Sequence, residues 1–184
     1  MLNVGDTVPD FTLPLAFADG KKEPVSFKSL TGKGPVVIAF FPLAFTGTCT
    51  KENCEIRDRA PELASHHVTA VGFSCDTPHS NVEFAKQNHL KHGLFSDPNH
   101  KVVNEIWDTG IAGGVASRAK RGWMVVDKHG KVAEKWVSDD PGVWSGIQTI
   151  RIRGASESRS RCWSRCCFQS SSTSLACRAI TSSI

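Results

Sequence analysis

The feature that most constrains the fold is the apolar run VVIAFF at residues 36–41, which lies between Pro35 and Pro42. A short run that is β-branched at its start and bounded by proline predicts a strand buried on both faces. A second run, VTAVGFS at residues 68–74, has the same character. With the 40% apolar content of an ordinary globular protein, these strands predict the covered sheet of an α/β protein.

Two helices and a hairpin are predicted around these strands. Thr77-Pro78 precedes a helical pattern at residues 81–87, and Asp97-Pro98 precedes one at residues 99–106. In each, a capping side chain stands before a proline that suits the first helical position. A hairpin is predicted where the strand patterns on either side of residues 128–130 meet. The result is a sheet of mixed direction.

The composition changes abruptly after residue 150. Residues 151–184 contain ten Ser, six Arg, one acidic residue and four of the seven Cys. Their net charge is +5, so residues 1–150 carry −1 of the total of +4. We expect one domain over residues 1–150 and a disordered tail over residues 151–184, because such a tail buries too little apolar area to offset its ordering entropy. A diffuse basic tail predicts no specific nucleic-acid partner.

The sequence predicts a cytoplasmic protein without a membrane partner. No apolar stretch reaches the roughly 18 residues that span a bilayer, and the first residues lack an apolar signal core. Residues 1–150 contain three cysteines, Cys49, Cys54 and Cys75, which is unlike a disulfide-stapled secreted scaffold. This cysteine usage favours a reducing compartment with selected reactive thiols.

Cys49 is the main candidate for chemistry. We expect a helix to begin near Thr48 or Cys49, after a short loop, and to end or kink at Pro61. The first turn of a helix stabilises an anion through its unpaired amide groups and its dipole. The thiolate is the nucleophilic form of cysteine, and peroxides oxidise it to sulfenic acid. The alternative is an inert, buried Cys49.

Pro42, Thr46 and Cys49 form the pattern P-x-x-x-T-x-x-C, and on this pattern the chain resembles the peroxiredoxin family. The segments at residues 5–11 and 121–127 also resemble the family's, in the right order. The likeness extends to about residue 150 and is greatest to the bacterioferritin-comigratory and AhpE-like types. It implies a thioredoxin-like α/β fold, with a central mixed sheet flanked by helices and an N-terminal hairpin extension.

The resemblance also implies a function and the residues that carry it. The chain would be a thiol-dependent peroxidase that reduces hydrogen peroxide or organic hydroperoxides through a sulfenic acid on Cys49. The Thr46 hydroxyl would orient the peroxide, and Arg121 would supply a fixed positive charge. Pro42 would shield the pocket, and Glu52 would position Arg121 by an ion pair. The resemblance implies no cofactor or metal.

These side chains also have ordinary interpretations. The Thr46 hydroxyl can bond its own backbone, and Glu52 can be a simple first-turn acid. Arg118 and Lys120 are rivals for the catalytic cation, but Arg121 directly precedes the predicted strand.

Cys54 is a tentative resolving residue. Five residues along one helix separate two side chains by roughly 140° and about 7.5 Å of rise. A disulfide needs Cα atoms within about 4.4–6.8 Å, so an intact helix forbids a Cys49–Cys54 bond and its first turns would have to unwind. The spacing is similar to that of the bacterioferritin-comigratory type. An external thiol or Cys75 are the alternatives.

Partners and a second function class remain open. The resemblance implies a peroxide substrate and thioredoxin or another thiol as reductant, and it allows a homodimer. The alternative function is a redox sensor or holdase that uses Cys49 oxidation as a signal rather than for turnover. Rapid catalytic turnover of peroxide favours the enzyme, and stoichiometric oxidation favours the sensor.

Overall fold

A computed structural model describes residues 1–146 and 150 of the chain. These residues fall within one compact unit, Met1–Arg153. The predicted disorder of residues 151–184 lies outside the described residues. Within the described residues, no helix has both the length and the apolar character needed to cross a membrane.

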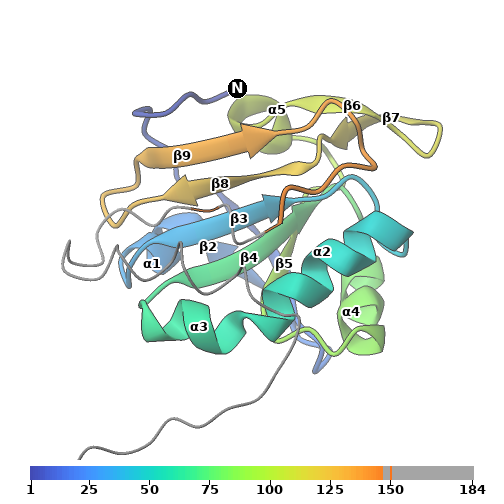
Figure 1. The fold of residues 1–184 in the computed structure, drawn as a ribbon, viewed down its shortest axis with the longest axis horizontal. Helices are drawn as coiled ribbons and strands as arrows, with labels where there is room; N and C mark the ends of the chain where they lie inside the picture. The colour runs from blue at the N-terminus through green and yellow to red at the C-terminus, as the bar shows by residue number, and fades with distance from the viewer. Residues whose placement is uncertain (147–149, 151–184) are drawn as a thin grey trace, which may run out of the picture. The chain divides into compact units, whose positions relative to one another are not determined.

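A seven-stranded mixed sheet forms the centre of this unit, in the order β2-β1-β5-β4-β3-β8-β9 (Figure 1). β3 and β4 are parallel, as are β4 and β5, whereas β1, β2, β8 and β9 are joined by antiparallel pairs. The strands are β1 Thr12–Ala16, β2 Lys22–Ser26, β3 Val36–Phe40, β4 Thr69–Ser74, β5 Gly93–Ser96, β8 Gly122–Val126 and β9 Val132–Val137. β6 Thr109–Ala112 and β7 Val115–Ala119 pair separately. The predicted mixed sheet and N-terminal hairpin are confirmed.

Five helices are present in the described residues, and they cover both faces of the sheet (Figure 1). They are α1 Phe27–Thr31, α2 Gly47–Asp58, α3 Ala60–Ser65, α4 Pro78–Gln87 and α5 Val103–Ile106. Side chains from α1 and α5 pack with one set of β3 residues, and side chains from α2 and α3 pack with the alternate set. α4 joins a third cluster that contains Phe41 and Cys49.

β3 confirms the prediction of a strand buried on both faces. Every residue of Val36–Phe40 is buried. Because side chains alternate along a strand, Ile38 and Phe40 enter the core on the α1 side, while Val37 and Ala39 enter the core on the α2 side. The strand therefore fixes the start of the loop that leads to α2, and with it the position of Cys49.

The helix starts differ in how well the sequence predicted them. The Thr77 hydroxyl caps α4 by accepting from the Ser80 amide at 3.2 Å, as expected. The helix predicted over residues 99–106 was too long, because α5 includes only Val103–Ile106. The Asp97 carboxylate accepts three amide hydrogen bonds from Lys101, Val102 and Val103, which satisfies these donors in a turn before the helix begins. The predicted hairpin forms between β8 and β9, and its turn contains Gly130 at φ 79°.

Candidate active site

The loop between β3 and α2 delivers Cys49 to the first turn of a helix. α2 begins at Gly47, slightly earlier than expected, and ends at Asp58 before Pro61 enters the first turn of α3. Thr46 is the N-cap residue in an extended conformation, but its side chain does not cap the helix. Cys49 is the third residue of α2 and is fully buried. The first-turn amides and the dipole of α2 thus favour an anion at this position.

Arg121 is the cation that contacts Cys49. Its Nη2 lies 3.1 Å from Cys49 Sγ, its Nη1 donates to the Glu52 carboxylate, and its Nε donates to the Pro141 carbonyl at 2.8 Å. The side chain of Arg121 is almost completely buried. Three different partners therefore fix the plane of the guanidinium, and one of its donors points at the sulfur.

Glu52 shares this buried guanidinium with Cys49. The Glu52 side chain is inaccessible to solvent, and its Oε1 atom has no hydrogen-bond partner among the described residues. Two buried acids beside one cation favour a state in which one of them keeps its proton. Burial accordingly raises the pKa of Glu52 to about 8, against the opposing effect of Arg121. A protonated Glu52 leaves more of the Arg121 charge for the sulfur.

A pocket of about 290 Å³ opens beside this cluster. It is lined by Pro42, Leu43, Thr46, Gly47, Thr48, Ala112, Gly113, Arg121, Pro141 and Gly142. Three of the predicted site residues, Pro42, Thr46 and Arg121, thus line one pocket. Cys49 does not line it but contacts Arg121, which does. The volume lies at the lower end of the range for small-molecule sites, so it suits a small substrate.

The Thr46 hydroxyl donates to the Leu43 carbonyl at 2.9 Å. Such a bond to the local backbone is the alternative to a catalytic role for Thr46 that the sequence allowed. Because a hydroxyl has one proton and two lone pairs, the bond leaves Thr46 as an acceptor toward the pocket. Arg121 can only donate. The pocket therefore presents one acceptor and one cationic donor to a bound molecule.

The two rival cations do not contact Cys49. Arg118 donates to the Cys75 carbonyl at 3.1 Å and pairs with Asp76, and Lys120 Nζ pairs with Asp108 at 2.9 Å and with Asp139 at 2.8 Å. Both are held by other partners.

The three cysteines of the described residues are free thiols in different surroundings. Cys54 is half-buried on α2, with its Sγ 3.9 Å from Asn88 Oδ1. Cys75, at the end of β4, is buried, and burial raises its pKa to about 11. A thiol that keeps its proton at neutral pH is a poor nucleophile, which favours Cys54 over Cys75 as the internal resolving residue.

Two residues of the site were missed from the sequence. Asn53 Nδ2 donates to the Cys49 carbonyl at 2.9 Å, and its Oδ1 lies 3.1 Å from His92 Nε2. Both side chains are buried, and burial lowers the pKa of His92 to about 4. The position of Asn53, four residues after Cys49 on a helix, was a usable signal. No local pattern connects His92, before β5, with α2.

A known protein family matches most of this chain. The model of the AhpC/TSA family matches residues 4–135. The chain belongs to the AhpC/TSA family. It is 37% identical over 132 residues to alkyl hydroperoxide reductase E of Mycobacterium tuberculosis (strain ATCC 25618 / H37Rv), a match that covers 71% of this chain and 82% of that protein. It is 28% identical over 140 residues to peroxiredoxin bcp1 of Schizosaccharomyces pombe, covering 76% of this chain and 69% of that protein.

Solved structures agree on the fold. The crystal structure of peroxidoxin BcpB from Mycobacterium tuberculosis superimposes with a TM-score of 0.68 at 34% identity, covering 76% of this chain and 88% of that chain. The predicted resemblance and the thioredoxin-like fold class are therefore confirmed. Within the described residues, no group of His, Cys, Asp and Glu side chains is arranged to hold a metal ion.

Proposed function

We propose that this member of the AhpC/TSA family is a thiol-dependent peroxidase whose nucleophile is Cys49. The observation that carries the proposal is the contact of 3.1 Å between Cys49 Sγ and the buried guanidinium of Arg121, beside a pocket of small-substrate size. The names of the relatives, alkyl hydroperoxide reductase and peroxiredoxin, support peroxide as the substrate and do not favour the sensor alternative.

The first step is a two-electron transfer. The Cys49 thiolate attacks one peroxide oxygen, an S–O bond forms and the O–O bond breaks. Sulfur is oxidised to sulfenic acid, and the leaving hydroxide or alkoxide takes a proton to become water or an alcohol. Arg121 stabilises the charge that develops on the leaving oxygen. Thr46 accepts the hydrogen bond of the peroxide O–H, and Pro42 limits access of water.

We propose that Cys54 resolves the sulfenic acid. The Cys54 thiolate attacks Cys49 sulfur, a disulfide forms, and the hydroxyl leaves as water after taking a proton. Both cysteines lie within α2, so its first turns must open. A dithiol such as that of thioredoxin then reduces the disulfide by exchange, which suits a reducing compartment.

Stopped-flow oxidation by hydrogen peroxide tests the nucleophile. Wild type and the Cys75→Ser variant are expected to show the same fast phase, and Cys49→Ser is expected to lack it. A fast phase that persists in Cys49→Ser overturns the assignment. Catalytic turnover with dithiothreitol as reductant separates the enzyme from a sensor, which would consume one equivalent of peroxide and stop.

Intact mass after one equivalent of peroxide tests the resolving residue. In a variant without Cys75 and the four tail cysteines, a Cys49–Cys54 disulfide lowers the mass by two hydrogens. The further change Cys54→Ser is expected to leave a sulfenic acid, which dimedone traps. Loss of two hydrogens in the presence of Cys54→Ser would contradict the proposal.

A further inference from the structure

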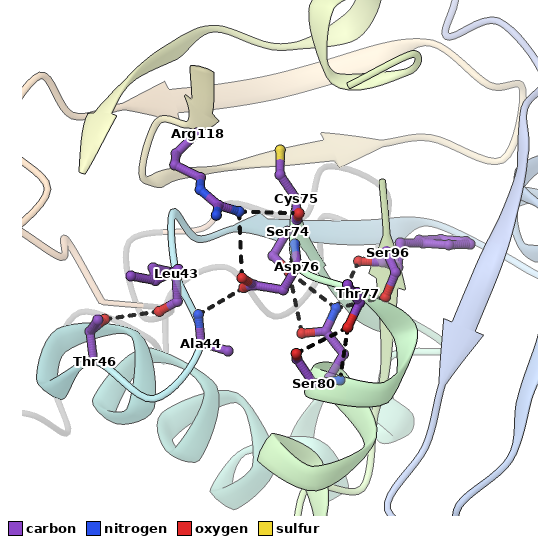
Figure 2. A network of polar contacts seen from close by, with 12 residues as sticks. Leu43, Ala44, Thr46, Ser74, Cys75, Asp76, Thr77, Ser80, Ser96 and Arg118 are labelled. Carbon is purple, nitrogen blue, oxygen red and sulfur yellow. Dashed lines mark hydrogen bonds and ion pairs between the residues drawn. The ribbon is translucent and has the colours of Figure 1, made fainter. Parts of the chain in front are cut away.

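The loop that carries Thr46 is tied to the end of β4 by a buried carboxylate (Figure 2). Asp76 Oδ2 accepts the Ala44 amide at 2.8 Å, and Asp76 Oδ1 lies 3.5 Å from Arg118 Nη1. Arg118 Nη1 also donates to the Cys75 carbonyl at 3.1 Å. The carboxylate therefore joins three segments: the β3–α2 loop, the end of β4 and β7.

A network of buried hydrogen bonds at the end of β4 holds Asp76 in place. The Asp76 amide donates to Ser74 Oγ at 3.2 Å, and Asn81 Nδ2 lies 3.1 Å from Ser74 Oγ and 2.8 Å from Ser96 Oγ. Ser74, Asn81 and Ser96 are completely buried. A buried and mutually bonded polar network of this kind has little freedom to move, so Asp76 offers the loop a fixed attachment point.

The loop needs such an attachment. Phe45 adopts a left-handed conformation at φ 64°, which is unfavourable for a residue with a Cβ atom. Its ring is half exposed and, among the described aromatic rings, contacts only Phe84, in a T-shaped arrangement. Within the part of the chain that the structure describes, the neighbouring Thr46 hydroxyl bonds only the loop's own Leu43 carbonyl, so the position of the hydroxyl follows the position of the loop backbone.

We propose that Asp76 and Arg118 are positioning residues for peroxide reduction. Asp76 fixes the Ala44 amide and thereby holds the Thr46 hydroxyl at its distance from Arg121, while Arg118 orients the Asp76 carboxylate. Arg118 lies three residues before Arg121, so the pair links the acceptor side of the pocket to the segment that carries the cationic donor. This inference rests on the proposed peroxidase function.

Two reactions of the same sulfur test the proposal. Reduction of peroxide requires the geometry of Thr46, whereas alkylation by iodoacetamide requires only that the reagent reach the Cys49 sulfur, which Arg121 contacts. Asp76→Ala is expected to lower the rate constant for hydrogen peroxide about 10- to 100-fold, because small misplacements of a positioning group have effects of this order. The alkylation rate, followed on the peptide that contains Cys49, is expected to stay within about threefold of wild type.

The conservative variants sharpen the test. Asp76→Asn keeps an oxygen that accepts the Ala44 amide, so it is expected to restore most of the peroxide rate. Arg118→Gln is expected to lower this rate less than Asp76→Ala, because the bond to Ala44 remains. Arg59→Gln breaks the partly exposed ion pair with Glu62 at 2.9 Å and is the matched control.

The outcomes separate the possible failures. A peroxide rate within threefold of wild type in Asp76→Ala overturns the proposal. Equal loss of both rates, with no rescue by Asp76→Asn, also overturns it and assigns Asp76 a structural role. A wild-type fast phase in Cys49→Ser would instead overturn the proposed peroxidase function itself.

Discussion

The two halves of α2 give two thiols on one helix very different surroundings. Cys49, in the first turn, is fully buried with Arg121 Nη2 at 3.1 Å from its sulfur. Cys54, five residues on, is half-buried, and Asn88 Oδ1 is 3.9 Å from its sulfur. Position at a helix N-terminus alone does not make the difference. The buried guanidinium of Arg121, fixed by three partners, makes the difference, because solvent screens its charge little at the Cys49 sulfur.

The ends of α2 are also tethered differently. The Cys49 end is tethered by Asn53, which bonds the Cys49 carbonyl and is itself bonded to His92. The Cys54 end is tethered by Arg57, whose Nη1 donates to the Asn88 carbonyl at 2.6 Å. A disulfide between the two thiols requires one tether to release. The Asn53 tether is the one that spans the first turn, so we expect it to open.

The largest effect is expected from removing the charge at the Cys49 end alone. Arg121→Gln should lower the rate constant for hydrogen peroxide by about 100- to 1000-fold, the usual cost of losing one preorganised donor to a developing anion. Stopped-flow fluorescence measures the rate. Alkylation of Cys54 by iodoacetamide should change less than about twofold, because Arg121 contacts Cys49 and not Cys54. A parallel loss of reactivity at both thiols would show that the two ends are not distinct.

The next effect concerns how the stability of the folded protein depends on His92, which bonds Asn53 in the Cys49 tether. Burial lowers the pKa of His92 to about 4 from 6.5, so between these values the unfolded chain binds more protons than the folded chain. Stability is therefore present above pH 6.5 and is lost as the pH falls toward 4, by about 3 kcal/mol. Urea unfolding of wild type and His92→Gln at several pH values measures it, and the stability of wild type relative to His92→Gln should fall by about 3 kcal/mol between pH 6.5 and 4.

Wild type must be compared with His92→Gln because Glu52 also makes the stability depend on pH. The pKa of Glu52 is raised from 4.5 to about 8, so its burial costs stability above pH 4.5, and stability from this group increases as the pH falls from 8. This contribution opposes that of His92 and is common to both proteins. The difference between wild type and His92→Gln isolates the histidine. Identical pH profiles for the two proteins would contradict a buried, neutral His92.

Local patterns predicted the parts of the molecule that depend on neighbours in sequence. The apolar run of β3 is of this kind and predicted the central strand, and the loop after it predicted that Cys49 lies in the first turn of a helix. The contact of Arg121 with Cys49, 72 residues apart, came from the family resemblance and not from any local pattern. No comparable signal marks His92, because its neutrality and its role follow from burial against α2.

Other differences have equally physical causes. The helix expected over residues 99–106 shortened to Val103–Ile106 because the Asp97 carboxylate can satisfy three amides without a helical turn. The sequence pattern predicted a helix start at Thr77 and gave no sign that Asp76 contacts the loop before α2. The Asp76 carboxylate bonds the Ala44 amide, 32 residues earlier, because the carboxyl ends of β3 and β4 meet at one edge of the sheet.

The smallest effect is expected from loosening the first turn itself. Asn53→Ala removes the side-chain bond to the Cys49 carbonyl, which is worth about 1 kcal/mol, and so raises the population of the opened turn about fivefold. Disulfide formation between Cys49 and Cys54, followed by quenched-flow mass spectrometry, should accelerate by the same factor. Oxidation by hydrogen peroxide should change less than about twofold, because Arg121 and Thr46 keep their places.

Asn104→Ala is the control for this change. Asn104 is exposed on α5, and its replacement should alter neither step. If Asn53→Ala slows disulfide formation, the Asn53 bond helps to align the two thiols instead of restraining them. Opening would then have to begin at the other tether, where Arg57 donates to the Asn88 carbonyl. The direction of the Asn53→Ala effect thus decides which end of α2 moves when the two thiols meet.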